Sequence, residues 1–324
     1  SRRKTRRKMK KIIVAFSILV GIIIFLFVAF FITFLTPVKD FKENFVVVHK
    51  GDNFNKIYDS LGIKYSVADK IYLKITGNAS KAKLGSYKFN GKVSRLEIIN
   101  KIVSGNTDEI RLTIPEGFTT KQVFERIEKL GLGKKEKLQQ ALNEMNFPYP
   151  HPNNNYEGYF YPETYFFYEG TTEKEIIQTI LGEFLKVYPQ EKYPDKNDFY
   201  NKLKLASIVE LEVSKKEDKP KVAGLFQKRL EIGMKLESDA TLKYILGRQA
   251  YRQELMTNMS PYNSYKHTGL TPTPISNPSK ETFDAVQNAE KMDELFFFTY
   301  EGKTYFSKTH DEHLKKRRET GQLK

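Results

Sequence analysis

The chain has 324 residues, of which 40% are hydrophobic and 13% aromatic, and its formal net charge at pH 7 is +15. Cysteine is absent, which excludes a disulfide framework and any metal site built on cysteine. Eight basic side chains and no acid lie in residues 1–11, and the mildly basic remainder lacks the arginine-rich helix or aromatic motif of a nucleic-acid-binding protein, so we expect no nucleic-acid partner.

An uncharged run from Ile12 to Leu35 follows this basic tail. A helix of that length spans the roughly 30 Å hydrocarbon core of a bilayer with some tilt. Because the basic tail precedes the run, the positive-inside rule predicts a cytoplasmic N-terminus and an extracytoplasmic body. The sequence Thr36-Pro37-Val38-Lys39 offers no small-residue cleavage site. We therefore expect an uncleaved, single-pass anchor in the cell membrane.

Residues 36–110 are expected to form a linker and a small α+β module. Residues 45–49 are typical of a strand, residues 50–52 of a turn, and residues 57–61 of a helix. The same stretch is similar to LysM-like glycan-binding modules, whose short V-x-x-G-D-x-x-x-x-I pattern is matched at four positions, Val48, Gly51, Asp52 and Ile57.

Residues 111–324 are expected to form a larger, mixed α+β domain. Ten Phe or Tyr side chains lie within residues 147–168, interleaved with four prolines. Aromatic rings with polar edges suit stacking on the flat face of a sugar. The same rings would equally suit packing on the core, and the sequence leaves both interpretations open.

Two glutamates, Glu210 and Glu212, lie in an apolar run near the end of a helix predicted over residues 199–213. A carboxylate is costly to bury unless it is paired or protonated, and a raised pKa allows it to act as a general acid near neutral pH. Helical periodicity places Glu212 within the apolar arc and Glu210 at its edge, so it does not decide which one is functional. Glutamates turned to solvent or to lysines are the structural alternative.

Three further elements follow this helix. Asp218 and Pro220 predict the start of a second helix that ends at Gly233. A long proline-rich loop over residues 260–278 is typical of a functional segment. Residues 295–307 predict a hairpin that turns at Glu301-Gly302-Lys303.

Five motifs in this order resemble the endolytic murein transglycosylases, the YceG-like family: IPEGFT at 114–119, EGYFYPETY at 157–165, LASIVE at 205–210, FQKRLEIGMKLESD at 226–239 and SPYNSYKHTGL at 260–270. The resemblance covers the whole chain. It implies a lytic transglycosylase, a carbon–oxygen lyase that cuts the β-1,4 bond between MurNAc and GlcNAc within peptidoglycan strands and leaves a 1,6-anhydro-MurNAc end. It also implies release of nascent strands from peptidoglycan synthases, the penicillin-binding proteins.

The resemblance implies that the catalytic residue is the glutamate that closes LASIVE, Glu210. Glu210 would protonate the glycosidic oxygen and then assist the 6-hydroxyl of the same sugar in attacking C1. One carboxylate suffices because the substrate supplies the nucleophile, whereas most glycoside hydrolases need two. The expected chemistry needs no cofactor and no metal. Substrate contacts are expected for seven further side chains: Glu163, Tyr165, Glu212, Glu237, Ser238, Asn263 and Tyr265.

The chain departs from the family pattern in the cleft loops. Glu237 stands where glutamine is usual, Ala240 where proline is usual, and Thr304 where a histidine is expected; Thr271 and Thr273 likewise replace a proline and a glycine. A non-catalytic peptidoglycan-binding scaffold of the synthesis machinery remains the alternative from another class. It predicts glycan binding without turnover. A cofactor-dependent carbon–carbon lyase is disfavoured because the chain has no glycine-rich phosphate loop.

Overall fold

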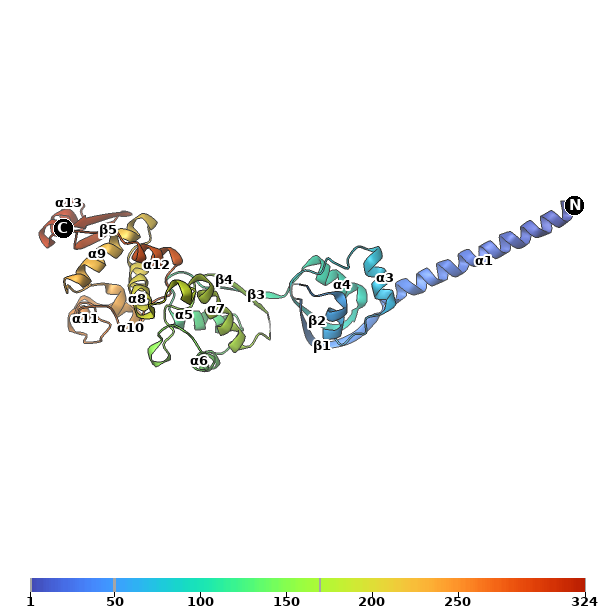
Figure 1. The fold of residues 1–324 in the computed structure, drawn as a ribbon, viewed down its shortest axis with the longest axis horizontal. Helices are drawn as coiled ribbons and strands as arrows, with labels where there is room; N and C mark the ends of the chain where they lie inside the picture. Colours follow the sequence, from blue (N-terminus) through green and yellow to red (C-terminus); the bar gives the residue numbers. More distant parts are fainter. Residues whose placement is uncertain (1, 49–50, 169, 324) are drawn as a thin grey trace. The chain divides into compact units, whose positions relative to one another are not determined.

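The structure, a computed structural model, describes residues 2–48, 51–168 and 170–323. The chain divides into two compact units, Ser1–Glu109 and Ile110–Lys324 (Figure 1). His49 and Lys50, which belong to the predicted strand and turn near the anchor, lie outside the described residues. The predicted α+β class with an N-terminal apolar helix is confirmed.

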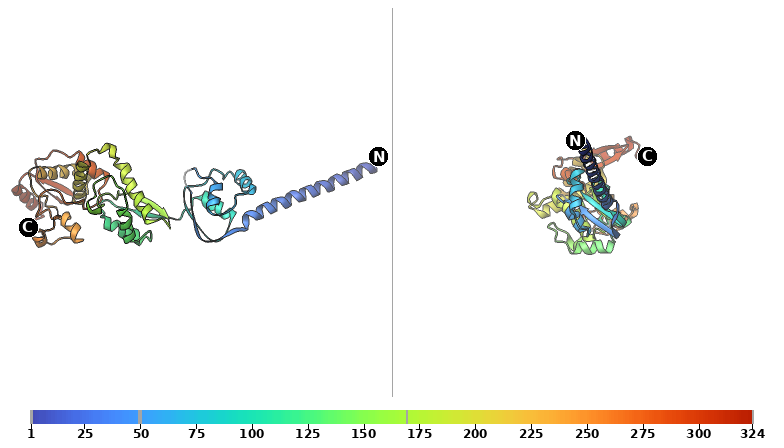
Figure 2. Two further views of the ribbon diagram at one scale, coloured as in Figure 1. Left: turned by 60° about the horizontal axis from the view of Figure 1, so that its bottom comes forward. Right: turned by 90° about the vertical axis from the view of Figure 1, so that its right-hand side faces the viewer.

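Helix α1 (Arg2–Leu35) begins the first unit as one unbroken helix (Figure 1, Figure 2). Its residues 6–35 have a mean hydropathy of 3.2 in their most apolar window, none of which is buried inside the protein, so the helix is long and apolar enough to cross a membrane. Only its last turns contact the rest of the unit, where Phe34 is 1% exposed.

A two-stranded antiparallel sheet and three helices complete the first unit. The sheet pairs β1 (Pro37–Val48) with β2 (Gly85–Ser94), and alternate residues such as Val46 and Val48 point to the core. Its helices are α2 (Phe54–Ser60), α3 (Val67–Ile75) and α4 (Arg95–Ser104). The predicted helix over 57–61 thus begins three residues earlier than expected.

The second unit is mainly helical. Its strands form two small sheets, β3 with β4 and β5 with β6, and the four strands are β3 (Glu109–Thr113), β4 (Thr164–Tyr168), β5 (Phe296–Tyr300) and β6 (Lys303–Ser307). The predicted terminal hairpin is confirmed by the pairing of β5 with β6. Its α-helices are α5 (Thr120–Lys129), α6 (Lys135–Asn143), α7 (Glu173–Val187), α8 (Lys196–Glu212), α9 (Lys219–Glu231), α10 (Asp239–Leu246), α11 (Arg252–Thr257), α12 (Lys280–Gln287) and α13 (His310–Glu319).

Helix α8 lies at the centre of this unit and packs against α9, α10 and α12. Its middle is buried all round, which explains why residues from Leu205 to Val209 contain almost no polar side chain. The one exception, Ser207, accepts a hydrogen bond from the Ile275 amide on its Oγ (3.0 Å), and its carbonyl accepts one from Ser276. These bonds fix the proline-rich loop against α8.

Most rings of the aromatic segment belong to the core. Tyr149, Tyr159 and Phe160 are at most 1% exposed, and Phe147 stacks edge to face on Tyr159 with ring centroids 4.8 Å apart. Their hydroxyls bind backbone carbonyls: Tyr149 donates to Tyr188 and Tyr159 to Pro150. For these rings the structure favours core packing over sugar stacking.

Gly224 allows the close packing of α9. A Cβ at this position would lie 1.8 Å from the Glu290 carbonyl oxygen, which is backbone and has no room to move. We predict that Gly224→Ala lowers the melting temperature of the second unit by several degrees. Gly182→Ala in α7 is the matched control, since its Cβ would meet nothing within 4 Å and alanine favours helix. Thermal unfolding of the full chain in detergent measures both, and equal melting temperatures would contradict the prediction.

Candidate active site

A cavity of about 710 Å³ opens in the second unit beside the C-terminal end of α8. This volume lies within the usual range for ligand sites. Loop 115–119, the start of α5 and helix α10 supply most of its wall, and its charged lining comprises four acids and two lysines: Glu125, Glu157, Glu212, Asp239, Lys121 and Lys243.

Glu212 ends α8 and lines this cavity. The Ser238 hydroxyl donates a short hydrogen bond to its Oε1. Burial raises the pKa of the Glu212 carboxyl above its usual 4.5; Asp239 raises it further, whereas the Ser238 hydroxyl and Arg229 act in the opposite direction. A carboxyl in this setting holds a proton to a higher pH than an ordinary glutamate does.

Glu210 lies two residues earlier but is bound on all sides by protein groups. Its Oε1 is 3.2 Å from Lys219 Nζ, and its Oε2 accepts hydrogen bonds from the Ser279 amide (2.8 Å), the Ser279 hydroxyl (2.7 Å) and the Thr282 hydroxyl (2.5 Å). Burial alone would raise the pKa of Glu210, but these hydrogen bonds and the Lys219 charge outweigh it and hold the pKa below 4.5. Glu210 thus joins α8 to α9 and α12 as a carboxylate, and its Cγ would lie 3.9 Å from a Cβ at Gly117, a residue that lines the cavity.

The side chains of Glu210 and Glu212 point in different directions because of helix geometry. Residues two apart on an α-helix differ by about 200° around its axis. Glu210 is held towards α9 and α12, whereas Glu212 points towards the start of α10, where Ser238 donates to it and Asp239 lies.

Glu157 is a third buried acid on the wall and only 3% exposed. Its Oε1 accepts hydrogen bonds from the amide (2.8 Å) and hydroxyl (3.2 Å) of Thr120, at the start of α5, and Tyr244 also hydrogen-bonds to it. Burial raises the pKa of Glu157 to about 7, although these hydrogen bonds lower it in part. In the sequence, Glu157 opens the motif EGYFYPETY, and the family resemblance gives it no role.

Asn277 holds the loops of this wall together. Its side-chain oxygen accepts from the Phe160 amide (2.9 Å), its Nδ2 donates to the Phe118 carbonyl (2.7 Å), and its own carbonyl accepts from the Gly117 amide (2.9 Å). Gly117 lies at φ 76° and its missing Cβ would meet Leu211 at 3.0 Å, so only glycine allows this loop to approach the end of α8.

Two of the predicted substrate-binding residues support the cavity from behind. Tyr265 donates to Asp239 Oδ1 (2.7 Å), which lines the cavity. Asn263 is fully buried, and its amide group donates to the carbonyls of Leu255 (2.9 Å) and Asn258 (2.8 Å) while its oxygen accepts from the Tyr265 amide. Asn263 therefore shapes its own loop. In the same loop, Ser264 Oγ accepts a hydrogen bond from the Ser238 amide (2.9 Å).

The remaining predicted contacts lie outside the lining of this cavity. Glu163 is exposed and accepts a hydrogen bond from its neighbour Thr164. Tyr165 is 5% exposed and donates to the Tyr161 carbonyl. Glu237 takes the left-handed conformation (φ 54°) with its carboxylate 3.6 Å from Arg229 Nη1. The structure thus brings together Glu212 and Ser238, with Tyr265 behind them.

Several residues of the cavity could not be identified from the sequence. Gln122 belongs to the capping box of α5, and Tyr244 lies in α10 outside the five family motifs. Asp239 closes a family motif, but its sequence position does not reveal its partner Tyr265, which is 26 residues away. Among the residues that the structure describes, no three His, Cys, Asp or Glu side chains form a group that could hold a metal ion.

Comparisons with known proteins agree on one family. The profile of the YceG-like family matches residues 46–319. An endolytic murein transglycosylase of Bacillus subtilis is 31% identical, over 78% of this chain and 77% of the relative. One of Streptococcus pneumoniae is 29% identical, over 86% of this chain and 59% of the relative. The crystal structure of a YceG-like protein from Listeria monocytogenes matches with a TM-score of 0.57 and 28% identity, over 85% of this chain and 98% of that one.

The Glu210 anchor predicts a pH-dependent stability. A carboxyl whose pKa is depressed on folding stabilises the protein above its unfolded pKa, and this contribution is lost as the pH falls. We predict that Glu210→Gln lowers the free energy of unfolding by about 3 kcal/mol at pH 7, because buried Lys219 loses its partner, and that this difference narrows below pH 4.5. Denaturant titrations of the full chain at pH 7 and pH 3.5 measure it.

The control is Glu231→Gln on the surface of α9, whose partner Lys228 lies 3.6 Å away and whose side chain is 68% exposed. Surface pairs contribute little, so this variant should match the wild type at both pH values. A Glu210→Gln effect that is the same at pH 7 and pH 3.5 would contradict the assignment of Glu210 as an ionised anchor.

Proposed function

Because the chain belongs to the YceG-like family and its relatives are named endolytic murein transglycosylases, we propose that it is a lytic transglycosylase of peptidoglycan with Glu212 as its general acid. The observation that carries the assignment of the acid is the contrast between the two glutamates. Glu212 lines the cavity and has a raised pKa, whereas Glu210 is occupied by Lys219, Ser279 and Thr282.

The reaction needs one group that first gives and then takes a proton. Protonated Glu212 donates to the oxygen of the β-1,4 bond between MurNAc and GlcNAc as that bond breaks. The resulting carboxylate then accepts the proton of the MurNAc 6-hydroxyl, whose oxygen attacks C1 of the same sugar. The products are a GlcNAc end with a free 4-hydroxyl and a 1,6-anhydro-MurNAc end, and water takes no part.

The family resemblance implies Glu210 for this role, and we propose Glu212 in its place. Glu210 would have to exchange four protein contacts for a substrate, and those contacts hold its pKa below that of an ordinary glutamate, which makes it the poorer proton donor of the two. In this proposal Glu210 is a positioning residue. It fixes the end of α8 and thereby the direction of Glu212.

The cavity has the composition of a sugar site. Asp239, Gln122 and Lys243 offer charged and amide groups to hydroxyl and N-acetyl groups, and Ser238 orients the acid. A second hollow of about 540 Å³ shares Lys121, Glu157 and Tyr244 with the first and continues to three asparagines, Asn153, Asn154 and Asn155. Two adjoining hollows suit a substrate that extends on both sides of the cleaved bond, as endolytic cleavage requires.

The first unit supports a location at the wall. Helix α1 with the basic residues 6–11 fits a single-pass anchor whose N-terminus is cytoplasmic and whose second unit is extracytoplasmic. The order β1, α2, α3, β2 and the match at Val48, Gly51, Asp52 and Ile57 support a LysM-like glycan-binding module. Such a position also suits release of nascent strands from membrane-bound peptidoglycan synthases.

Product analysis tests the reaction and the acid together. We predict that the full chain in detergent converts purified peptidoglycan into fragments with 1,6-anhydro-MurNAc ends, detected by mass spectrometry. Glu212→Gln should reduce the rate at least about 100-fold, since general acid catalysis contributes this much. Glu210→Gln should keep measurable activity, lowered by its smaller folded fraction and by the less firmly held Glu212. Products with reducing ends would indicate hydrolysis. Glycan binding without products would support the scaffold alternative. Full activity of Glu212→Gln would indicate that Glu210 is the general acid.

The pH profile tests the setting of Glu212. Activity should fall as the pH rises through the pKa of Glu212, because only the protonated carboxyl can donate. Ser238→Ala removes a hydrogen bond that stabilises the carboxylate, so we expect this alkaline limb to move to higher pH. Thr257→Ala on the exposed face of α11 is the control and should leave the profile unchanged. A limb that moves to lower pH in Ser238→Ala would contradict the assignment.

A further inference from the structure

Helix α3 in the first unit exposes a stripe of aliphatic side chains. Val67, Ile71 and Ile75 are 76%, 45% and 78% exposed, and they follow one another at intervals of four residues. At this spacing they lie within about 80° of one another around the helix. Asp69 and Leu73 on the opposite face are buried in the unit. The helix therefore has two apolar faces, and the core of its own unit covers only one of them.

The stripe begins where the membrane-spanning helix ends. Phe34, in the last turn of α1, stacks on Tyr72 of α3 with ring centroids 4.4 Å apart and an interplanar angle of 24°. Figure 1 shows α3 beside the point at which α1 meets its unit. A membrane surface at the end of α1 would thus meet α3 without any rearrangement of the unit.

The charges around the stripe match a lipid surface. Residues 64–83 contain five lysines and one acid, Asp69, which is paired with Arg95 at 2.6 Å. Lys70 and Lys74 are exposed on α3 itself. Amphipathic helices that lie in the membrane interface combine aliphatic residues on one face with lysines beside it, and each lysine near an anionic surface strengthens membrane binding.

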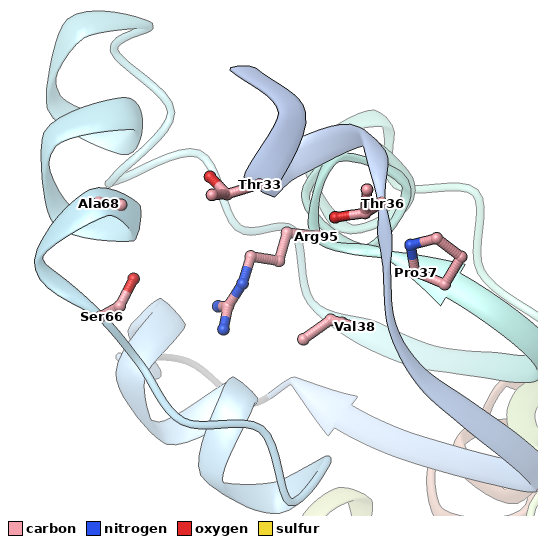
Figure 3. Close-up of a pocket in the computed structure, with 7 residues that line it drawn as sticks. All are labelled: Thr33, Thr36, Pro37, Val38, Ser66, Ala68 and Arg95. Atoms are coloured by element: carbon pink, nitrogen blue, oxygen red, sulfur yellow. The ribbon is translucent and has the colours of Figure 1, made fainter. Parts of the chain in front are cut away.

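A hollow of about 440 Å³ lies between the end of α1 and the start of α3 (Figure 3). Its lining offers the hydroxyls of Thr33, Thr36 and Ser66 and the guanidinium of Arg95. Arg95 is held in place by Asp69 and by the Lys64 carbonyl (3.1 Å), and its side chain is 15% exposed. Hydroxyls and a guanidinium beside the end of a membrane span suit the phosphate of a lipid headgroup.

We propose that α3 lies in the membrane interface, with Val67, Ile71 and Ile75 among the acyl chains and an anionic lipid headgroup at the Arg95 hollow. This inference rests on the proposed role of α1 as a membrane span, and it concerns the leaflet into which the end of α1 emerges. The first unit is then a lipid-bound platform attached at two places, α1 and α3.

Tryptophan fluorescence tests the inference cleanly because the chain contains no tryptophan. Ile71→Trp is introduced into the full chain, which is reconstituted into vesicles of phosphatidylcholine with and without phosphatidylglycerol. We expect blue-shifted emission and strong quenching by lipids brominated on their acyl chains. Asn106→Trp, at an exposed position where the chain leaves the unit, is the matched control and should emit as in water.

Charge reversal tests the headgroup part. Lys70→Glu with Lys74→Glu in the Ile71→Trp chain should weaken the quenching, and more so in vesicles that contain phosphatidylglycerol. Unquenched Ile71→Trp emission that matches Asn106→Trp overturns insertion of the stripe. Quenching that is equally strong with and without phosphatidylglycerol, and equally strong in the chain with Lys70→Glu and Lys74→Glu, overturns the anionic headgroup site.

Alkaline carbonate extraction separates this inference from the anchor on which it rests. Vesicle-bound protein that resists extraction but shows no quenching overturns the α3 inference alone. Protein that is extracted overturns the anchor, and the inference falls with it. Neither result depends on glycan cleavage, which is measured separately.

Discussion

The second unit depends on one buried cluster of polar groups, in which the Glu210 carboxylate pairs with Lys219 and accepts hydrogen bonds from Ser279 and Thr282. These four side chains come from α8, the start of α9 and the start of α12, so one carboxylate ties together three helices that pack around the core. Lys219 and Glu210 are each about 5% exposed in their side chains. A buried charge pair of this kind is tolerated only when its remaining hydrogen-bonding capacity is used, and here it is.

This cluster fixes the end of α8 and with it the position of Glu212 in the cavity. Because Glu210 is held towards α9 and α12, Glu212, two residues later on α8, points towards Ser238 and the start of α10. The two environments also separate the acidities of the two carboxyls in opposite directions, as happens in catalytic pairs where one carboxyl must stay ionised and the other must carry a proton. In the function that we propose, Glu210 positions the end of α8 and Glu212 donates the proton.

The departures from the family pattern acquire local explanations. Glu237 has its carboxylate beside the largely buried Arg229, which also donates to the carbonyls of Lys235 and Leu236, so the extra acid is matched by a cation. Thr304 donates to Asp218 (2.6 Å) and thereby fastens the terminal hairpin to the start of α9. Neither residue lines the cavity, and both act on the framework around it.

Local patterns in the sequence determined the class of the fold, the apolar helix, the terminal hairpin, the existence of α8 and the family, because propensity, periodicity and motif order are properties of neighbouring residues. The sequence also singled out the two glutamates: periodicity left both open, and the family resemblance implied Glu210. What the sequence could not provide is the surroundings of each carboxylate, Lys219, Ser279 and Thr282 at one and Ser238 and Asp239 at the other, because most of these partners are 26 to 72 residues away. The same holds for the aromatic segment. Its rings belong to the core because they pack around Phe184 and Phe199, which the sequence pattern does not reveal. Burial and charge at a single atom are set by the chain that folds over it, and only the tertiary structure contains that information.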